Sequence, residues 1–298
     1  MRCLPALAMA LILGFASPAA QAQSIPAAVI SDPAPGLTPP PRSAEVLVPS
    51  HGLGMNALFY LAGGPGPHPT LVLLHGLPGN EQNLDLAQAV RRAGWNVLTL
   101  HYRGAWGSPG TFSIAGVQED ANAAVAFVRQ PEVAAKYGID TRKIVLGGHS
   151  MGGFATASHA RKDPELLGVI LIDAWNAGAS GAQFANLTPA QRAATAPQRF
   201  NDFGNSLNGA TPASIMEEVV AHQADWNYQA WAADLTKRPL LAIGASQAFG
   251  PESHRLAQAV AAAGGQVTDI TLESDHSFQD HRIALEAQVV SWLQALAK

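Results

Sequence analysis

The stretch IVLGGHSMGGFATASHA, residues 144–160, places Ser150 between two pairs of glycines. An apolar run typical of a buried strand leads into the motif GHSMG, and an alanine-rich run typical of a helix follows it. The motif fits G-x-S-x-G in the strand–turn–helix context that a nucleophile elbow requires. Glycines suit such a sharp turn, because side chains there would collide with the neighbouring strand and helix. We predict that Ser150 is a nucleophile at a helix amino terminus, where partial positive charge favours a developing anion. The alternative is an ordinary glycine-rich turn.

Apolar runs of strand length recur along the rest of the chain. We predict strands in eight of them: AEVLVPS, GMNALFYLA, TLVLLHG, WNVLTLHY, KIVLGGHS, LLGVILID, RPLLAIGAS and QVTDITLE. Helical periods lie between most of the later runs, for example the shared face of Val117, Ala121, Ala124 and Val128. Strands that alternate with helices form a mostly parallel sheet with helices on both faces, so the predicted fold class is α/β.

One segment interrupts this alternation. Residues 174–237 separate two predicted strands and read as several short helices, in PAQRAATA, PASIMEEVVAHQA and YQAWAADL. A connection of this length in a compact domain is usually functional. We therefore interpret the segment as a helical lid inserted after the sixth strand, with a purely structural insertion as the alternative.

The amino-terminal residues have the layout of an export signal. Residues 1–22 contain one basic residue, an apolar run too short to span a bilayer, and the small-x-small sequence AQA at their end. We predict a cleaved signal peptide and hence a periplasmic or secreted protein, with an uncleaved anchor as the alternative. The proline-rich residues 23–43 predict an extended linker without structure of its own. The folded domain is then expected over residues 44–298.

The composition narrows the classes of partner and cofactor. The chain has 18 basic and 22 acidic residues, and this mild acidic excess argues against nucleic acid or an anionic membrane as partner. Beyond the predicted signal, no apolar run reaches the length of a membrane span. The one cysteine, Cys3, lies in the predicted signal, and no two histidines stand four residues apart around an acidic residue. We therefore expect neither disulfides nor a metal site.

Several histidines are candidates for the general base that would activate Ser150. His276, in LESDHSFQDHR, follows the last predicted strand and precedes the last predicted helix, where a loop histidine can reach the serine. His149 neighbours Ser150 in a turn that directs adjacent side chains apart, whereas His254 and His281 fall in predicted helices. We therefore assign the base to His276, with a solvated loop histidine as the alternative.

Two backbone N–H groups are candidates for an oxyanion hole. A predicted strand in LVLLHGLPGN ends at His75, and the following loop can aim an N–H at the same point as the N–H of Met151. Pro78 has no N–H, so Leu77 is the better donor. We interpret His75 as a support for this loop rather than as a base.

The motifs HGLPGN, HYRGAWGSPG, GHSMGG and DHSF make the chain resemble the α/β-hydrolase superfamily from about Ala44 onward. Within it, they resemble the dienelactone-hydrolase and acylaminoacyl-peptidase-like branch of bacterial serine esterases. The resemblance implies an eight-stranded sheet, a serine esterase mechanism and no cofactor. It carries the catalytic roles over to Ser150 and His276, and the oxyanion roles to Leu77 and Met151.

The acid of the triad departs from the family pattern. Relatives place an aspartate shortly after the seventh strand, where this chain reads GASQAFGPESH and has Gln247. Glutamine can hold an imidazole by hydrogen bonding but does not stabilise an imidazolium by charge. Asp173, at the end of the sixth predicted strand, is the preferred candidate. Glu252, at a helix start, is the second, and the third possibility is neither. Asp275 is too close to His276 in sequence to reach the far imidazole nitrogen easily.

These residues predict an exported serine hydrolase that cleaves small carboxylic esters through an acyl-enzyme on Ser150. The same residues would serve amide or acyl-peptide cleavage, or perhydrolysis. A different class of function is a binding module on a hydrolase fold with impaired catalysis, an alternative that Gln247 raises. We expect the predicted lid to set the acyl and alcohol preference.

Overall fold

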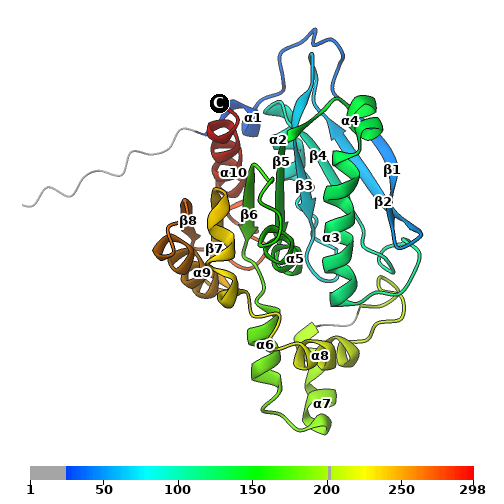
Figure 1. The fold of residues 1–298 in the computed structure, drawn as a ribbon, viewed down its shortest axis with the longest axis vertical. Helices are drawn as coiled ribbons and strands as arrows, with labels where there is room; N and C mark the ends of the chain where they lie inside the picture. The colour runs from blue at the N-terminus through cyan, green and yellow to red at the C-terminus, as the bar shows by residue number, and fades with distance from the viewer. Residues whose placement is uncertain (1–24, 201–202) are drawn as a thin grey trace, which may run out of the picture.

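The sheet forms the centre of the molecule. The computed structural model describes residues 25–200 and 203–298. Their eight strands form one sheet in the order β1-β2-β4-β3-β5-β6-β7-β8 (Figure 1). All eight apolar runs that we assigned to strands form these strands, and the predicted fold class is confirmed. The strands are β1 (Arg42–Ser50), β2 (Leu53–Leu61), β3 (His68–Leu74), β4 (Asn96–Leu100), β5 (Ile139–His149), β6 (Gly168–Ile172), β7 (Leu240–Ala245) and β8 (Val267–Leu272).

Strand direction brings the predicted functional loops to one edge. β2 runs antiparallel to both β1 and β4, and the remaining neighbours pair in parallel. The carboxyl ends of β3, β5, β6, β7 and β8 therefore lie at the same edge of the sheet, where open α/β sheets bind their ligands. Leu77, Ser150, Asp173, Gln247 and His276 each follow one of these five strands within five residues.

Helices cover both faces of the sheet. α2 (Leu84–Arg92) and α10 (Arg282–Leu296) pack on one face, whereas α3 (Ile114–Arg129), α5 (Met151–Ala160) and α9 (Gly250–Ala262) pack on the other. The short α4 (Pro131–Tyr137) contacts α3 and β5. The helical face predicted for Val117, Ala121, Ala124 and Val128 is fully buried in α3, because its period matches the side of the helix that faces the sheet.

The segment that follows β6 is helical, as predicted. It contains α6 (Ala177–Phe184), α7 (Pro189–Phe200), α8 (Pro212–Ala221) and two 3₁₀ helices, η1 (Tyr228–Trp231) and η2 (Asp234–Lys237). Figure 1 shows α6, α7 and α8 grouped beyond the edge of the sheet. The segment is anchored to the core in two ways. The rings of its three tryptophans have centroids 5.7–6.3 Å from that of Phe154 in α5, and the Glu218 carboxylate of α8 accepts hydrogen bonds from the first backbone N–H groups of α3.

Part of the amino-terminal segment differs from our expectation of an unstructured linker. Ala27–Ile30 forms a short helix, α1, which contacts α2 and α10 and buries Val29. The Arg92 side chain donates to the carbonyls of Ala28, at 2.6 Å, and Val29, at 3.2 Å. A proline-rich composition thus did not exclude an apolar turn that docks on the core. The predicted signal peptide, residues 1–22, lies outside the described residues. Among those described, no helix combines the length and hydropathy needed to cross a membrane.

Candidate active site

Ser150 occupies a strained turn between β5 and α5. Its φ of 57° and ψ of −118° lie where a residue with a side chain is rarely found. The neighbouring structure holds it there: the Ser150 N–H donates to the Ile172 carbonyl and its own carbonyl accepts from Trp175, each at 3.0 Å. The flanking glycines are explained as predicted. A Cβ on Gly148 would lie 2.3 Å from the carbonyl group of Gly152.

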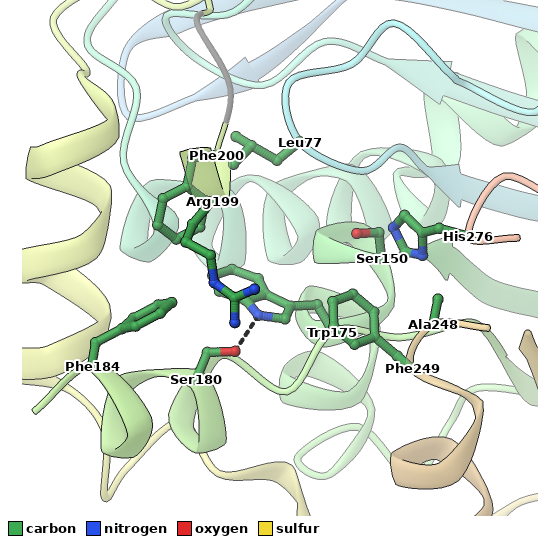
Figure 2. A pocket seen from close by; sticks show the side chains of 10 residues that line it. All are labelled: Leu77, Ser150, Trp175, Ser180, Phe184, Arg199, Phe200, Ala248, Phe249 and His276. Carbon is green, nitrogen blue, oxygen red and sulfur yellow. Dashed lines mark hydrogen bonds between the residues drawn. The ribbon is translucent and has the colours of Figure 1, made fainter. Parts of the chain in front are cut away.

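A cavity of about 320 Å³ opens beside this serine. Figure 2 shows Ser150 and His276 on one side of it, with the hydroxyl of Ser150 directed into the cavity. Two further groups complete the wall: Leu77, Ala248 and Phe249 come from loops at the strand ends, and Trp175, Ser180, Phe184, Arg199 and Phe200 come from the segment inserted after β6. The insertion therefore forms one side of the cavity that the elbow serine faces.

The structure brings His276 and Asp173 into contact. The Nδ1 atom of His276 lies 2.5 Å from Oδ2 of Asp173, which is fully buried directly after β6. Because a carboxylate oxygen accepts, Nδ1 carries the proton and Nε2 is left free to accept one. This is the arrangement in which a histidine can take a proton from a serine hydroxyl.

The loop after β7 holds Asp173 through its backbone. Oδ1 accepts from the Ala245 N–H at 2.9 Å, and Oδ2 accepts from the Phe249 N–H at 3.3 Å. Gln247, between these donors, is exposed, and its backbone N–H donates to the carbonyl of Ser274. The loop that carries the aspartate in the family pattern thus supplies hydrogen-bond donors here, and these stabilise a carboxylate that the previous strand supplies.

The other two carboxylates that we considered lie elsewhere. Glu252 sits in the first turn of α9, where burial raises its pKa, and it pairs with Arg255 at 3.6 Å. The Asp275 carboxylate turns into its own loop and accepts from the backbone N–H groups of Ser277 and Gln279. Of the three candidates, the structure joins only Asp173 to the imidazole of His276.

His149 makes contacts that the sequence did not reveal. Its ring lies against that of His276, with 4.5 Å between centroids, and its Nε2 lies 2.8 Å from the His276 carbonyl. Burial, followed by the proximity of His276, lowers the pKa of His149 to about 3, so the ring is neutral near pH 7. Since a carbonyl accepts, Nε2–H is the donor. The sequence predicted only that the turn directs the side chains of His149 and Ser150 apart; the structure adds that the His149 ring packs against the loop that carries His276.

The loop after β3 passes directly over the serine. A Cβ on Gly76 would lie 2.9 Å from Cβ of Ser150. Several bonds fix the loop: His75 Nδ1–H donates to the Gly76 carbonyl at 2.7 Å, and Trp106 Nε1–H donates to the Pro78 carbonyl at 2.8 Å. Burial lowers the pKa of His75 to about 4, so it is a neutral donor near pH 7. These contacts fit the supporting role that we predicted for His75.

The two predicted oxyanion donors are the backbone N–H groups of Leu77 and Met151. Leu77 lines the cavity together with Ser150. Met151 is the first residue of α5, so its N–H has no acceptor within the helix. The other two histidines that we weighed against His276 do not line the cavity: His254 pairs with Asp269, and His281, directly before α10, pairs with Asp280 at 2.9 Å.

Comparison with known proteins gives one family. A model described as the alpha/beta hydrolase family matches residues 71–288. Among solved structures, the thermophilic and thermostable carboxylesterase EstE1, cloned from a metagenomic library, has a TM-score of 0.61 at 16% identity, over 91% of this chain and 92% of its own.

Two further esterase structures are similar to the same extent. Brefeldin A esterase, a bacterial homologue of human hormone-sensitive lipase, has a TM-score of 0.62 at 18% identity, over 91% of this chain and 82% of its own. A hyperthermophilic esterase from the archaeon Pyrobaculum calidifontis has a TM-score of 0.58 at 17% identity, over 86% of both chains. At these identities the likeness concerns the fold. The resemblance to α/β hydrolases that the sequence motifs indicated is confirmed.

Proposed function

Because the chain belongs to the alpha/beta hydrolase family, we propose that it is a serine hydrolase that cleaves carboxylic esters through an acyl-enzyme on Ser150. The observation that carries the proposal is the hydrogen bond of 2.5 Å between His276 and Asp173, beside the cavity that Ser150 lines. A fold alone does not give a function, whereas a serine on an elbow and a histidine oriented by a buried carboxylate are chemically specific.

In the first half of the reaction, Ser150 Oγ attacks the ester carbonyl carbon while Nε2 of His276 takes the hydroxyl proton. The carbonyl oxygen becomes an oxyanion, which the N–H groups of Leu77 and Met151 stabilise. The buried Asp173 carboxylate balances the positive charge of the imidazolium. As the C–O bond to the alcohol breaks, Nε2–H returns its proton to the leaving oxygen, and the acyl group remains on Ser150.

The second half repeats these steps with water as the nucleophile. His276 takes a proton from water, the hydroxide attacks the acyl carbon, and the proton passes to Ser150 Oγ when the acid leaves. The free enzyme is restored, and the net reaction adds one water across the ester. Every proton transfer uses Nε2, so the tautomer that Asp173 fixes serves both halves.

We further propose that the insertion acts as a lid that sets substrate preference, since Trp175, Phe184 and Phe200 form an apolar wall of the cavity. We also propose that residues 1–22 are a cleaved export signal, so that the enzyme is periplasmic or secreted. Amino-terminal sequencing of the protein recovered from a periplasmic or culture fraction tests it, and a start at Met1 there would contradict cleavage.

The experiment that tests the proposed function combines labelling and turnover. A fluorophosphonate probe is expected to label the wild type, and Ser150→Ala is expected to lose both labelling and hydrolysis of p-nitrophenyl esters. Thr156→Val, a buried hydroxyl of α5, is the matched control and should retain both. Amino-acid p-nitroanilides, assayed in parallel, separate ester from amide cleavage. Persistent labelling in Ser150→Ala would refute the assignment of the nucleophile.

A further inference from the structure

Among the described residues that line the cavity beside Ser150, one side chain is permanently charged. Arg199, from the end of α7, lines it together with the aromatic rings of Phe184, Phe200 and Trp175. Figure 2 shows Arg199 turned into the cavity between Phe184 and Trp175, on the side away from His276. Ser150 and His276 come from the strand-end loops on the other side of the cavity (Figure 2), so the positive charge lies on the side that the insertion forms.

This guanidinium has no acidic partner within the described parts of the chain. Over residues 25–200 and 203–298, no carboxylate lies within ion-pair distance of Arg199, and its recorded contact is with the ring of Phe184, 5.7 Å from the centroid. Arg192, earlier in the same helix, is different: its side chain binds both oxygens of Glu217, at 2.7 and 2.9 Å. Arg199 is exposed, so a solute that enters the cavity can reach it.

A carboxylate is the chemical group that fits this position. Guanidinium presents a planar fork of N–H donors that matches the two oxygens of a carboxylate. Methylene groups between the ester and the carboxylate would contact Phe184, Phe200 and Trp175. The combination of an apolar passage and a terminal cation therefore selects an aliphatic chain that ends in an anion.

The carboxylate that Arg199 would bind belongs to the acyl part of the ester, not to the alcohol part. In the acyl-enzyme the acyl group is bonded to Ser150, and Ser150 lines the cavity that contains Arg199. A second cavity, of about 450 Å³, is also lined by Leu77 and His276 but not by Ser150. Glu81 lines that cavity, and its negative charge disfavours an anion there, so we assign the second cavity to the leaving alcohol.

We propose that this enzyme prefers esters whose acyl group ends in a carboxylate, the monoesters of aliphatic dicarboxylic acids, and that Arg199 is the residue that selects them. The inference rests on the proposed function, because it names the substrate class of the same site. The preference for these monoesters requires a positive charge at position 199, whereas the hydrolysis of neutral esters does not.

The test compares matched substrates. The p-nitrophenyl monoesters of adipic, pimelic and suberic acids are assayed beside the p-nitrophenyl esters of hexanoic, heptanoic and octanoic acids. Arg199→Gln is expected to lower kcat/KM on the best dicarboxylic monoester by on the order of tenfold or more, the range for a charge-assisted hydrogen bond. It should change kcat/KM on the neutral ester of equal length by less than about threefold. Arg199→Lys should retain part of the preference, because the charge stays and the fork is lost.

Two controls locate the effect. Arg192→Gln removes the same charge from the same helix outside the cavity, and it should leave the preference for the carboxylate unchanged. Esters that carry the carboxylate on the alcohol should be insensitive to Arg199→Gln. Equal losses on neutral and anionic esters, an equal effect of Arg192→Gln, or a loss confined to alcohol-side carboxylates would each overturn the inference.

A binding measurement separates this inference from the proposed function. Monomethyl adipate, titrated calorimetrically into Ser150→Ala, should bind, and the added change Arg199→Gln should weaken that binding on the order of tenfold. If neutral esters are cleaved in a Ser150-dependent manner while Arg199→Gln affects neither binding nor preference, only the inference is wrong. If no ester is cleaved yet monomethyl adipate binds through Arg199, the proposed chemistry is wrong and the anion site is real.

Discussion

His149 donates a hydrogen bond of 2.8 Å from Nε2–H to the carbonyl of His276, and the two rings lie with centroids 4.5 Å apart. The residue before the elbow serine thus supports the loop that carries the proposed base. Asp173 orients the His276 ring from one side, and His149 fixes its backbone from another. Serine and base are therefore positioned relative to each other through one short segment of chain.

His149→Phe should lower kcat without raising KM. Phenylalanine keeps a ring at this position but removes the donor, so the His276 carbonyl loses its partner; we expect a fall of about five- to tenfold. His149→Gln, whose amide nitrogen can reach the place of Nε2, should recover part of the activity. Since the pKa of His149 is about 3, the ratio of wild-type to variant kcat should be constant from pH 5 to 8. A ratio that changes across this range would mean that His149 titrates in the mechanism.

Asp173→Asn should reduce kcat by roughly a thousand- to ten-thousandfold, as observed when a triad aspartate is amidated. The amide can still accept from the Ala245 N–H, but its NH₂ then faces Nδ1 of His276. That contact favours the tautomer with the proton on Nε2, which cannot accept the serine proton. Steady-state kinetics on p-nitrophenyl acetate measures the loss. Glu252→Gln is the control and should stay within about twofold; a large loss there, with a small one at position 173, would reverse the assignment of the acid.

Glu218→Gln should loosen the attachment of the insertion. Both carboxylate oxygens of Glu218 accept at 2.9 Å, from the N–H groups of Ile114 and Ala115 at the start of α3. Loss of the charge at a helix amino terminus should cost about 1–2 kcal/mol of the free energy of unfolding, measured by urea denaturation. Glu217→Gln is the adjacent control: this exposed carboxylate pairs with Arg192, and its loss should cost less than about 0.5 kcal/mol. Equal costs at the two positions would contradict the anchoring role.

The free energy of unfolding should fall as the pH rises from about 5 to 8, because Glu286 loses its proton in the folded protein over this range. Burial, followed by the neighbouring carboxylate of Asp85, raises the pKa of Glu286 to about 7, although Arg282 and Arg92 oppose the shift. The folded chain holds this proton more tightly than the unfolded chain. The resulting stabilisation is therefore full below about pH 4 and is lost as the pH rises through 7.

Glu286→Gln keeps this position neutral at every pH and should remove the loss. Relative to the wild type, its free energy of unfolding should increase by about 1–3 kcal/mol between pH 4.5 and 8, from urea midpoints at several pH values. Glu132→Gln, at an exposed position in α4, controls for the general effect of removing a charge. A constant difference between wild type and Glu286→Gln would refute the raised pKa.

Much of the fold was predictable because its signals are local. Each strand is a short apolar run, and the turn at Ser150 needs glycines that stand next to it in the sequence. His276 could be placed because it lies in the loop between the last strand and the last helix. The carboxylate partner of His276 was harder to predict, since it depends on two neighbouring strands: Asp173 follows β6, yet the N–H groups that hold it come from the end of β7 and the loop after it. The sequence around β6 or around β7 alone does not indicate these hydrogen bonds.

The contacts that sequence analysis missed join residues far apart along the chain. His149 and His276 meet across 127 positions, and a histidine beside a serine has no signature for such a partner. Arg199 is one of two basic residues in α7, and sequence analysis assigned it no role, because the direction in which α7 presents it depends on how the insertion packs. The burial of Val29 was not predicted, because the prolines around it indicate an extended backbone but say nothing about where an apolar side chain packs.

The junction at residues 173–175 has a mechanical consequence. Asp173 is bonded to β7 through its own N–H, which donates to the Ile243 carbonyl at 2.6 Å, and the Trp175 N–H is bonded to Ser150. The chain that leads from β6 into the insertion is therefore hydrogen-bonded to its neighbours on both sides of Ala174. For the esterase proposed here, we expect changes in α6 or α7 to alter which acyl groups are admitted and to leave the rate of the bond-breaking step the same. Breadth of substrate and speed of chemistry would then be separately adjustable.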